Sequence, residues 1–368
     1  MSSKNDLLAI WRSGVAAVQG RSSVNSALAA HQITRPDFVI AAGKAAASMA
    51  AAVHDTFGKI PTLIVTKYGH TEDAPKHAIV VQSAHPVPDE ASLAGGAAIQ
   101  DAISKCEKDA HLLFLVSGGA SSLAEVLPAG ITLKDLTLET EILLASGKDI
   151  HAMNARRKEV SQIKGGKALE GFMGSRVTAF AISDVQGDDV GVIGSGIAAA
   201  PDTFDFEYNS LIVASNQIAR QAAADHAGTS AISNLEDMYD DVTVLATKIV
   251  AQLRASKDGI HIMGGEPTVV LPSNPGLGGR NMMLAAMIAR EIKGTTGIRV
   301  LVAGTDGTDG PTDAAGALVD GKTWDESGHL AIQQANVAPW LDAKDVLIRS
   351  GPTGTNVMDL LIAEVRSS

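Results

Sequence analysis

Several features that would place a protein in a particular class are scarce or absent in this sequence of 368 residues. Its single cysteine, Cys106, excludes a disulfide within the chain, and zinc-binding CxxC pairs are absent. No apolar run approaches the roughly 18 residues of a membrane span, and the first residues lack the apolar core of a signal peptide. Long Lys/Arg runs are missing, and the formal net charge is −11. We therefore expect a cytoplasmic protein with no membrane or nucleic-acid partner.

Aromatic residues are also few, at 4% of the chain, whereas glycine contributes 36 residues. The core must therefore consist mainly of Ala, Val, Leu and Ile, and close helix–sheet contacts and tight loops are favoured. A chain of this length suggests two domains, each large enough to bury its own core. No pattern in the sequence indicates an oligomeric state.

Short apolar runs alternate with helix-forming segments through the first part of the chain. These runs predict strands at residues 38–42, 63–65, 79–81, 112–116, 177–182 and 211–214, after a helix at 6–19. Apolar strands that alternate with helices indicate a parallel sheet covered on both faces. We predict a Rossmann-like α/β domain over residues 1–236, with a doubly wound, mostly parallel sheet. Ligands of such sheets bind beyond the carboxyl ends of the strands.

A second, smaller α/β domain is expected over residues 237–368. Residues 242–253 predict a helix, and a strand is expected within 259–271, around Gly264-Gly265-Glu266-Pro267. Another strand at 299–303 ends in a loop rich in glycine and aspartate, residues 304–310. No low-complexity linker separates the two domains.

The segment Ser117-Gly118-Gly119-Ala120-Ser121-Ser122 follows the predicted strand at 112–116. Its glycines let the backbone approach a ligand, and hydroxyls surround them, which is typical of a loop that cradles phosphate. A flexible strand–helix turn is the alternative interpretation. The segment is not a P-loop, because GxxxxGK[ST] is absent from the chain.

Cationic side chains occur at two predicted helix starts. Gly43-Lys44 and Gly279-Arg280 lie where free backbone N–H groups attract anions, and arginine matches carboxylate or phosphate oxygens bidentately. A surface lysine beside a turn glycine is the alternative for Lys44. Residues 154–167 are strongly cationic and include Lys164 and Gly165 as candidate nucleotide contacts. A solvated helix face explains that charge run equally well.

Carboxylates follow two of the predicted strands. Asp184 comes directly after the strand at 177–182, and Asp306 lies in the loop after the strand at 299–303. Either can bind Mg²⁺, and Asp184 can also accept a proton from a hydroxyl. Helix capping by Asp184 and turn stabilisation by Asp306 are the alternatives.

Residues 194–199 fit the dinucleotide fingerprint GxGxx[GA]. A true fingerprint opens a helix, and the next strand ends in an acidic residue that holds the ribose. Here the next strand ends in Ser215-Asn216, and Pro201 interrupts the helix. We interpret the match as accidental.

The order of these loops resembles the glycerate 2-kinase family, whose C-terminal half is called the MOFRL domain. The matching segments are residues 43–45, 65–70, 85–89, 117–122, 154–166, 194–196, 264–268, 278–281, 304–310 and 353–356. The resemblance implies two α/β domains with the active site in the cleft between them. It also implies phosphorylation of glycerate to 2-phosphoglycerate with ATP and Mg²⁺ as cofactors. Lys44 and Arg280 match the two basic residues of the family's site, one from each domain.

These arguments together assign candidate roles to site residues. The predicted catalytic residues are Lys44, Arg280 and Asp184. Glycerate is expected to contact Gly43, Lys44, Arg280 and Asn281, and Mg²⁺ to bind Asp184 and Asp306. The predicted ATP contacts are Ser117, Gly118, Gly119, Ser121, Ser122, Lys164 and Gly165.

The sequence departs from the family pattern at two places, which bears on the substrate more than on the reaction. Ile197 stands where the family tends to have proline, and Met282-Met283 where it tends to have glutamate. A longer sugar acid such as erythronate or threonate is therefore an alternative to glycerate, and neither enantiomer of glycerate is favoured. A hydroxypyruvate reductase that uses NAD(P)H, a label that some relatives carry, is the alternative reaction.

Overall fold

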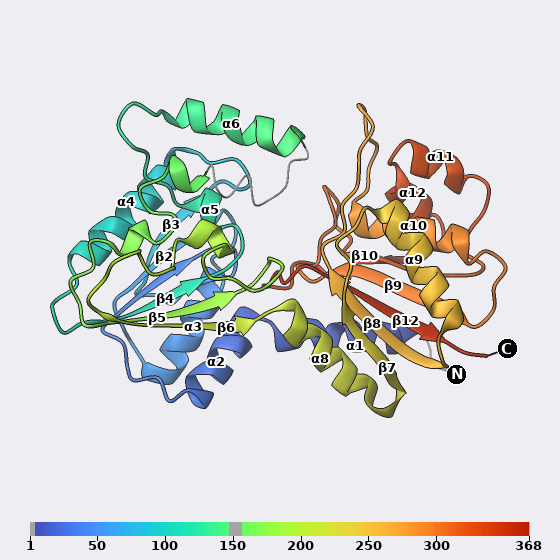
Figure 1. Cartoon of the computed structure of the whole chain (residues 1–368), viewed down its shortest axis with the longest axis horizontal. Coiled ribbons are helices and arrows are strands. Elements are labelled where there is room, and N and C mark those ends of the chain that lie inside the picture. Colours follow the sequence, from blue (N-terminus) through green and yellow to red (C-terminus); the bar gives the residue numbers. More distant parts are fainter. Residues whose placement is uncertain (1–3, 147–156, 368) are drawn as a thin grey trace. The chain divides into compact units, whose positions relative to one another are not determined.

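The computed structural model describes residues 4–146 and 157–367, which form two compact units (Figure 1). We call them the parallel-sheet unit, Val18–Ser215 with Gly354–Asn356, and the mixed-sheet unit, Met1–Ala17, Asn216–Thr353 and Val357–Ser368. Each is an α/β structure with its own buried apolar core. No helix in the described ranges is both long and apolar enough to cross a membrane.

The parallel-sheet unit contains the predicted strands. They are β1 (Phe38–Ala42), β2 (Thr62–Lys67), β3 (Ile79–Ser83), β4 (His111–Val116), β5 (Arg176–Ile182) and β6 (Glu207–Ala214). Their order is β3-β2-β1-β4-β5-β6, and all neighbours pair in parallel. All six residues of β4 are buried, as expected for a strand covered on both faces. The predicted doubly wound sheet is therefore confirmed.

Helices cover both faces of this sheet (Figure 1). Helices α2 (Gly20–Ala30) and α3 (Ala46–Phe57) lie on one face, and α4 (Glu90–Ser104) lies on the other. Ile40 and Ala42 of β1 share a core cluster with Ile99 and Ile103 of α4. The other described elements of the unit are α5 (Ala120–Leu123), α6 (Leu133–Ser146), η1 (Lys167–Leu169) and η2 (Ile193–Gly196).

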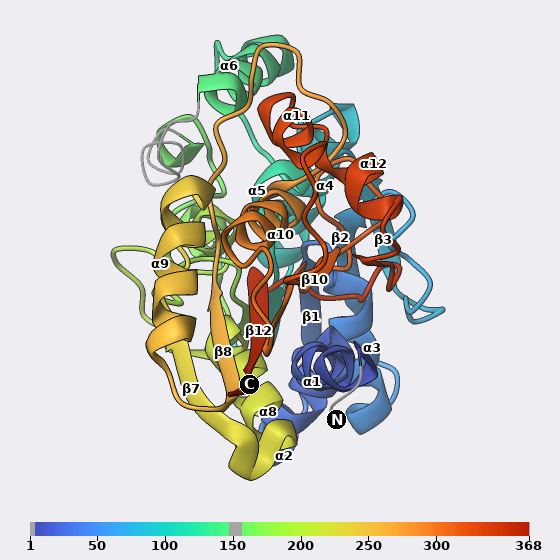
Figure 2. The same ribbon diagram turned by 90° about the vertical axis from the view of Figure 1, so that its right-hand side faces the viewer.

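The mixed-sheet unit contains β7 (Ala231–Glu236), β8 (Gly259–Gly265), β9 (Ile298–Gly304), β10 (Gly316–Asp320), β11 (Leu347–Ile348) and β12 (Asp359–Val365). Their order is β11-β10-β9-β12-β8-β7. β7 and β8 pair in parallel, and the other neighbours are antiparallel. Helices α9 (Val242–Ala255) and α10 (Arg280–Glu291) cover one face, and α1 (Lys4–Ala17) and α8 (Asn216–Ala227) the other (Figure 2). The remaining elements are η3 (Gly228–Ser230), α11 (Gly328–Gln333) and α12 (Val337–Asp342).

The boundary between the units differs from the expected division at residue 236. The chain passes from one unit to the other at Ser215–Asn216, and the first helix belongs to the unit that contains the C-terminal half. The reason is packing: α8 contacts α1, β7 and β8, and β7 pairs with β8. Apolar periodicity identifies a helix or strand, but it does not say which sheet that element joins.

Candidate functional site

Two loops at the carboxyl ends of neighbouring strands are joined by hydrogen bonds. The backbone N–H of Lys44 donates to the Gly118 carbonyl at 3.0 Å, and the Ala45 N–H donates to Ser117 Oγ at 3.0 Å. Gly43 has a φ of 127°, and a Cβ there would lie 2.2 Å from Ser117 Oγ. Gly43 therefore lets the β1 and β4 loops approach each other, which is a structural role beside its predicted substrate contact.

The accessible part of the 117–122 loop is smaller than predicted. Ser117 and Ser122 are only 2% and 3% exposed, and Gly118 is buried as well. The Ser117 hydroxyl oxygen accepts a hydrogen bond from the Ala45 N–H of the neighbouring loop, so this buried side chain holds the two loops together. Gly119 and Ser121 remain as the partly exposed positions that can face a phosphate.

Three side chains line this loop. A Cβ on Gly119, where φ is 86°, would lie 3.0 Å from His85 Cδ2 and 3.3 Å from Lys44 Cε. A Cβ on Gly118 would lie 2.2 Å from Asp184 Oδ2. The structure therefore brings the predicted Lys44 and Asp184 to one glycine loop and adds His85, to which sequence analysis gave no role.

His85 is a neutral imidazole within a cationic group. Burial and the charge of Lys44, followed by those of Lys67, Arg157 and His70, lower the pKa of His85 to about 3. His70 lies nearby, with Nδ1 3.3 Å from the Lys44 carbonyl oxygen. The histidines are spread along the sequence and show no ligand spacing. One feature of the sequence could have indicated a site role. His70 and His85 each follow a predicted strand, and the carboxyl ends of these strands lie at the sheet edge that carries the glycine loop.

Lys164 does not occupy the nucleotide-facing position that we predicted. It is 1% exposed, and its Nζ forms an ion pair and hydrogen bond with the fully buried Glu125. Burial lowers the pKa of Lys164, and the Glu125 carboxylate opposes that shift. The predicted contact between Lys164 and ATP stays a prediction, which this burial disfavours, because the ammonium would have to leave its Glu125 partner to reach a ligand.

Another residue of the same cationic segment approaches the loop instead. Arg157 Nη1 lies 3.4 Å from Ser121 Oγ, and burial lowers the pKa of Arg157. Gly165 is exposed, and its N–H donates to the Ser195 carbonyl at 2.9 Å. Residues 154–156 of the segment lie outside the described ranges. Arg157 is thus a candidate phosphate contact that the sequence did not single out.

The 194–196 segment does not have the geometry of a dinucleotide fingerprint. It forms η2, in which Gly194, Ser195 and Gly196 have φ values of 56°, 58° and 75°. Carbonyls of this turn accept the N–H groups of Gly165 and Gly166, each at 2.9 Å. The turn therefore supports the 165–166 backbone and does not open a helix after a strand, in agreement with our interpretation of the match as accidental.

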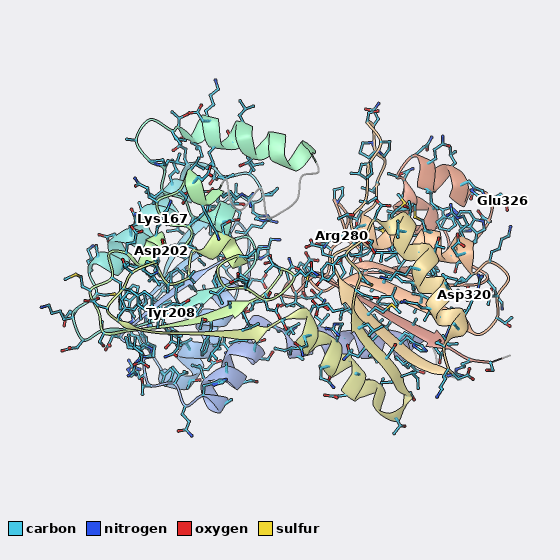
Figure 3. All side chains as sticks on the ribbon, in the orientation of Figure 1. Lys167, Asp202, Tyr208, Arg280, Asp320 and Glu326 are labelled. Carbon is cyan, nitrogen blue, oxygen red and sulfur yellow. The ribbon has the colours of Figure 1, made fainter. Side chains whose placement is uncertain are left out.

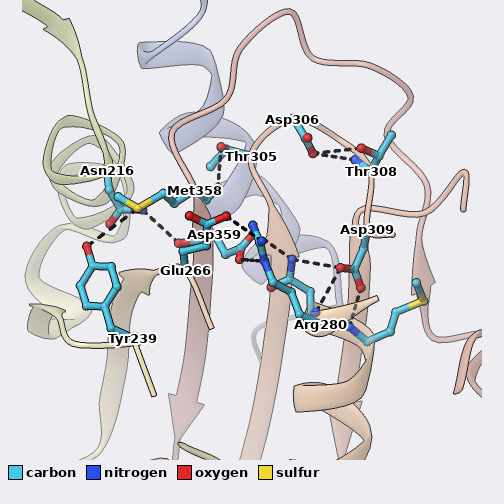
Figure 4. Close-up of polar contacts among 12 residues, drawn as sticks. Asn216, Tyr239, Glu266, Arg280, Thr305, Asp306, Thr308, Asp309, Met358 and Asp359 are labelled. Carbon is cyan, nitrogen blue, oxygen red and sulfur yellow. Dashed lines mark hydrogen bonds and ion pairs between the residues drawn. The ribbon is translucent and has the colours of Figure 1, made fainter. Parts of the chain in front are cut away.

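Arg280 begins α10 in the mixed-sheet unit and is held by carboxylates (Figure 4). Its Nε donates to Asp359 Oδ2, and its Nη1 donates to Glu266 Oε1, both at 2.7 Å. Burial disfavours the charge of Arg280, but Asp359 and Glu266 outweigh it and raise the pKa of Arg280 above its ordinary value. In Figure 3 Arg280 lies at one end of the sheet, and Asp320, where β10 ends, lies at the other.

Asn281 differs from the prediction that it contacts substrate. It is 1% exposed, and its Nδ2 donates to Asp359 Oδ1 at 2.8 Å. Its Oδ1 is buried and has no hydrogen-bond partner among the described residues. The predicted contact between Asn281 and substrate stays a prediction, which the burial of this amide and its hydrogen bond to Asp359 disfavour.

The two aspartates of the 304–310 loop have different roles. Asp306 Oδ1 accepts the Thr308 N–H at 3.0 Å, which is the turn-stabilising role left open above. Burial raises the pKa of Asp309 to about 7, although N–H donors from Met282 and Asn281 favour its charged form. Within residues 4–146 and 157–367, no group of three or more His, Cys, Asp or Glu side chains could hold a metal ion.

The fold and these contacts define an α/β protein with cationic side chains at a glycine loop and at a helix start. A glycine loop lined by Lys44 lies at the edge of the parallel sheet, and an arginine held by carboxylates lies at the edge of the mixed sheet. Helix starts and glycine loops of this type suit phosphate and carboxylate groups.

Comparison with known proteins identifies the family. A domain of unknown function (DUF4147) matches residues 6–227, and the MOFRL family matches residues 259–359. A D-glycerate 2-kinase from Thermotoga maritima is 33% identical over 88% of this chain and 89% of that protein. A putative hydroxypyruvate reductase from Agrobacterium vitis is 32% identical over 88% of this chain and 97% of that protein. The crystal structure of Thermotoga maritima glycerate kinase matches with a TM-score of 0.88 and 30% identity, over 99% of each chain. The chain belongs to the glycerate 2-kinase family.

Proposed function

We propose that this protein is a glycerate 2-kinase that uses ATP to phosphorylate the 2-hydroxyl of glycerate. The observation that carries the proposal is Lys44 against the Gly119 backbone at the carboxyl end of the parallel sheet. Phosphoryl transfer depends mainly on positioning and on stabilisation of negative charge, so preorganised cations and backbone N–H groups are what the protein must supply. Membership of the family supports glycerate as the acceptor.

In this proposal each described group has a defined task. Gly119 and Ser121 face the ATP phosphates, and Lys44 and Arg157 neutralise their charge. Arg280 binds the glycerate carboxylate or the transferring phosphoryl group. As the 2-hydroxyl oxygen bonds to the γ-phosphorus, the bond from that phosphorus to the bridging oxygen breaks and ADP leaves. Asp184 accepts the hydroxyl proton.

Mg²⁺ is part of the proposal as a charge-neutralising partner of ATP. This ion is usually held by one or two carboxylates together with substrate phosphates and water, so a cluster of three protein ligands is not required. The Asp184 carboxylate against the phosphate-facing loop fits such a ligand. Asp306 is the second candidate, through the oxygen that does not accept from Thr308. A cytoplasmic location also belongs to the proposal, since the single cysteine fits a reducing compartment.

The test is to incubate the purified protein with ATP, Mg²⁺ and D-glycerate and to measure ADP and 2-phosphoglycerate. L-glycerate, erythronate and threonate form the comparison panel. Lys44→Ala is expected to lower kcat/KM by about 10², the scale of losing one transition-state contact. The exposed Lys59→Ala serves as the matched control. If ADP is released with another sugar acid but not with glycerate, the protein is a kinase of that sugar acid instead. NADH oxidation with hydroxypyruvate, without ADP release, would replace the kinase by the reductase.

A further inference from the structure

Arg280 forms two ion pairs that differ in burial. Its Asp359 partner has a side chain that is 2% exposed, whereas the side chain of Glu266 is 40% exposed. Loss of one member of a buried pair leaves an uncompensated buried charge and is strongly destabilising. Exposed pairs contribute much less, because solvent screens them. Asp359 is therefore the partner that determines where the guanidinium of Arg280 lies.

Asp359 is placed for this task by the sheet. It begins β12, with Gly265 of β8 on one side and Gly304 of β9 on the other. Its Oδ2 accepts from Arg280 Nε at 2.7 Å, and its Oδ1 accepts from Asn281 Nδ2 at 2.8 Å. One buried carboxylate thus holds two consecutive side chains at the start of α10 (Figure 4).

Asp309 holds the backbone of the same helix start. Gly279 is the N-cap of α10 and has no side chain to cap it. Asp309 supplies the cap from 28 positions away, accepting the Asn281 N–H at Oδ1 at 3.1 Å. Its Oδ2 accepts the Met282 N–H at 2.7 Å. A Cβ on Gly279 would lie 2.2 Å from Asp309 Oδ1, so a glycine at this position is required for the contact.

We propose that Asp359 and Asp309 are positioning residues, which act on the reaction by holding Arg280 and do not touch the substrate. Asp359 fixes the guanidinium, and Asp309 fixes the helix start that carries it. Nε and Nη1 of Arg280 are occupied, and Nη2 makes no hydrogen bond to the described residues. That nitrogen is left for an anionic group. The inference rests on the proposed function, in which Arg280 binds such a group.

The test is a double-mutant cycle on kcat/KM for glycerate with Asp359→Asn and Arg280→Ala. Asp359→Asn alone is expected to lower kcat/KM by about 10², since misplacement of a catalytic group by about 1 Å has that effect. If Asp359 acts only through Arg280, the double variant should be no slower than Arg280→Ala alone. If the loss of kcat/KM in the double variant equals the product of the two single-variant losses, the two residues act independently and the inference is overturned.

Glu364→Gln is the matched control for a purely structural effect. Glu364 is a buried carboxylate on the same strand, and it pairs with Arg299, an arginine of β9. This control should lower the thermal midpoint much as Asp359→Asn does while leaving kcat/KM nearly unchanged. An equal loss of kcat/KM in the control would contradict a specific role for Asp359.

Asp309→Asn keeps the test valid if Asp359→Asn does not fold. The substituted amide retains one acceptor for the N–H groups of α10, and the same cycle with Arg280→Ala applies. Absence of sugar-acid kinase activity in the wild type would overturn the proposed function together with this inference. An active wild type with multiplicative losses would overturn this inference alone.

Discussion

At the scale of single residues, similar side chains have opposite roles because of where the fold places them. Lys44 and Lys164 are both lysines in segments that match the family, but Lys44 lines a glycine loop and Lys164 is buried with Glu125. The same contrast separates Asp184, which lies beside the 117–122 loop, from Asp309, which caps a helix. Burial and partners decide which charges are available to a ligand.

The buried Lys164–Glu125 pair makes a stability prediction. Lys164→Met should reduce the free energy of unfolding by about 3–5 kcal/mol, because it leaves the Glu125 carboxylate buried without its partner. Lys293→Met, which removes an ion pair with Glu326 on the surface, should have a much smaller effect. Urea unfolding of both variants measures the difference. Equal losses would show that the buried pair is not the stabilising element that its burial indicates.

His85 makes a prediction about pH. Its pKa is about 3 in the folded protein against an ordinary 6.5, so between these values the unfolded chain binds a proton that the folded protein excludes. The free energy of unfolding should therefore decrease as pH falls below 6.5, by up to about 1.4 kcal/mol per pH unit from this residue. His85→Gln should flatten that decrease.

Urea unfolding between pH 7 and pH 4 measures this dependence. His31→Gln, which replaces an exposed histidine, is the control and should follow the wild-type curve. An unchanged pH dependence in His85→Gln would mean that His85 is not held neutral by burial and the neighbouring charges of Lys44, Lys67, Arg157 and His70.

At the scale of elements, helix starts organise both sites. Asp89 caps α4, accepting the Ser92 N–H at 3.1 Å, and Ser92 Oγ accepts the Asp89 N–H in return. Asp89 also accepts from the Tyr68 hydroxyl at 2.8 Å, so it connects the loop after β2 to the loop that contains His85. This cap therefore supports the loop that places His85 against Gly119.

Two aspartate caps allow a matched comparison. Asp89→Ala and Asp241→Ala, which removes the cap of α9, should each cost about 1 kcal/mol of stability. Only Asp89→Ala should also lower kcat/KM, because it releases the loop of His85. Thermal unfolding and steady-state kinetics of both variants test this. An unaltered kcat/KM in Asp89→Ala would show that the position of the loop containing His85 does not affect catalysis.

At the scale of the whole molecule, the chain crosses between its units more than once. Helix α1 begins the sequence but packs on α8 and β12 of the mixed-sheet unit. Leu7, Ile10, Trp11 and Val15, the predicted apolar face, are all buried. The N-terminal helix therefore stabilises the unit that contains Arg280 and not the parallel-sheet unit that follows it in sequence.

Trp11→Ala tests this arrangement. Removal of this buried ring should cost about 3–5 kcal/mol, the usual range for truncation of a large aromatic in a core. Hydrogen exchange should show the lost protection mainly in the amides of β8 and β12, while those of β1 and β4 change little. Greater loss of protection in β1 and β4 would contradict the assignment of α1 to the mixed-sheet unit.

Some of the site could be predicted from sequence because its determinants are local. A strand, a glycine turn and a following helix occupy adjacent residues, which is why Lys44, the 117–122 loop and Arg280 could be recognised. Asp359 could not, because its role depends on β12, the last strand of the chain, inserting in the sheet between β8 and β9, which come much earlier in the sequence. Arg157 was likewise missed and His85 received no specific role, since their neighbours at the loop are distant in sequence.

Local sequence patterns were enough to predict the α/β class, the strands of the parallel sheet and the loops that carry glycine and charge. Apolar periodicity and turn residues specify these features within a few positions of each residue. The folded structure was needed to see that Lys164 and Asn281 are buried, that α1 joins the mixed-sheet unit and that Asp309 and Asp359 contact the start of α10. Burial and pairing depend on strand order and packing between distant segments, and these set the charge and accessibility of each side chain.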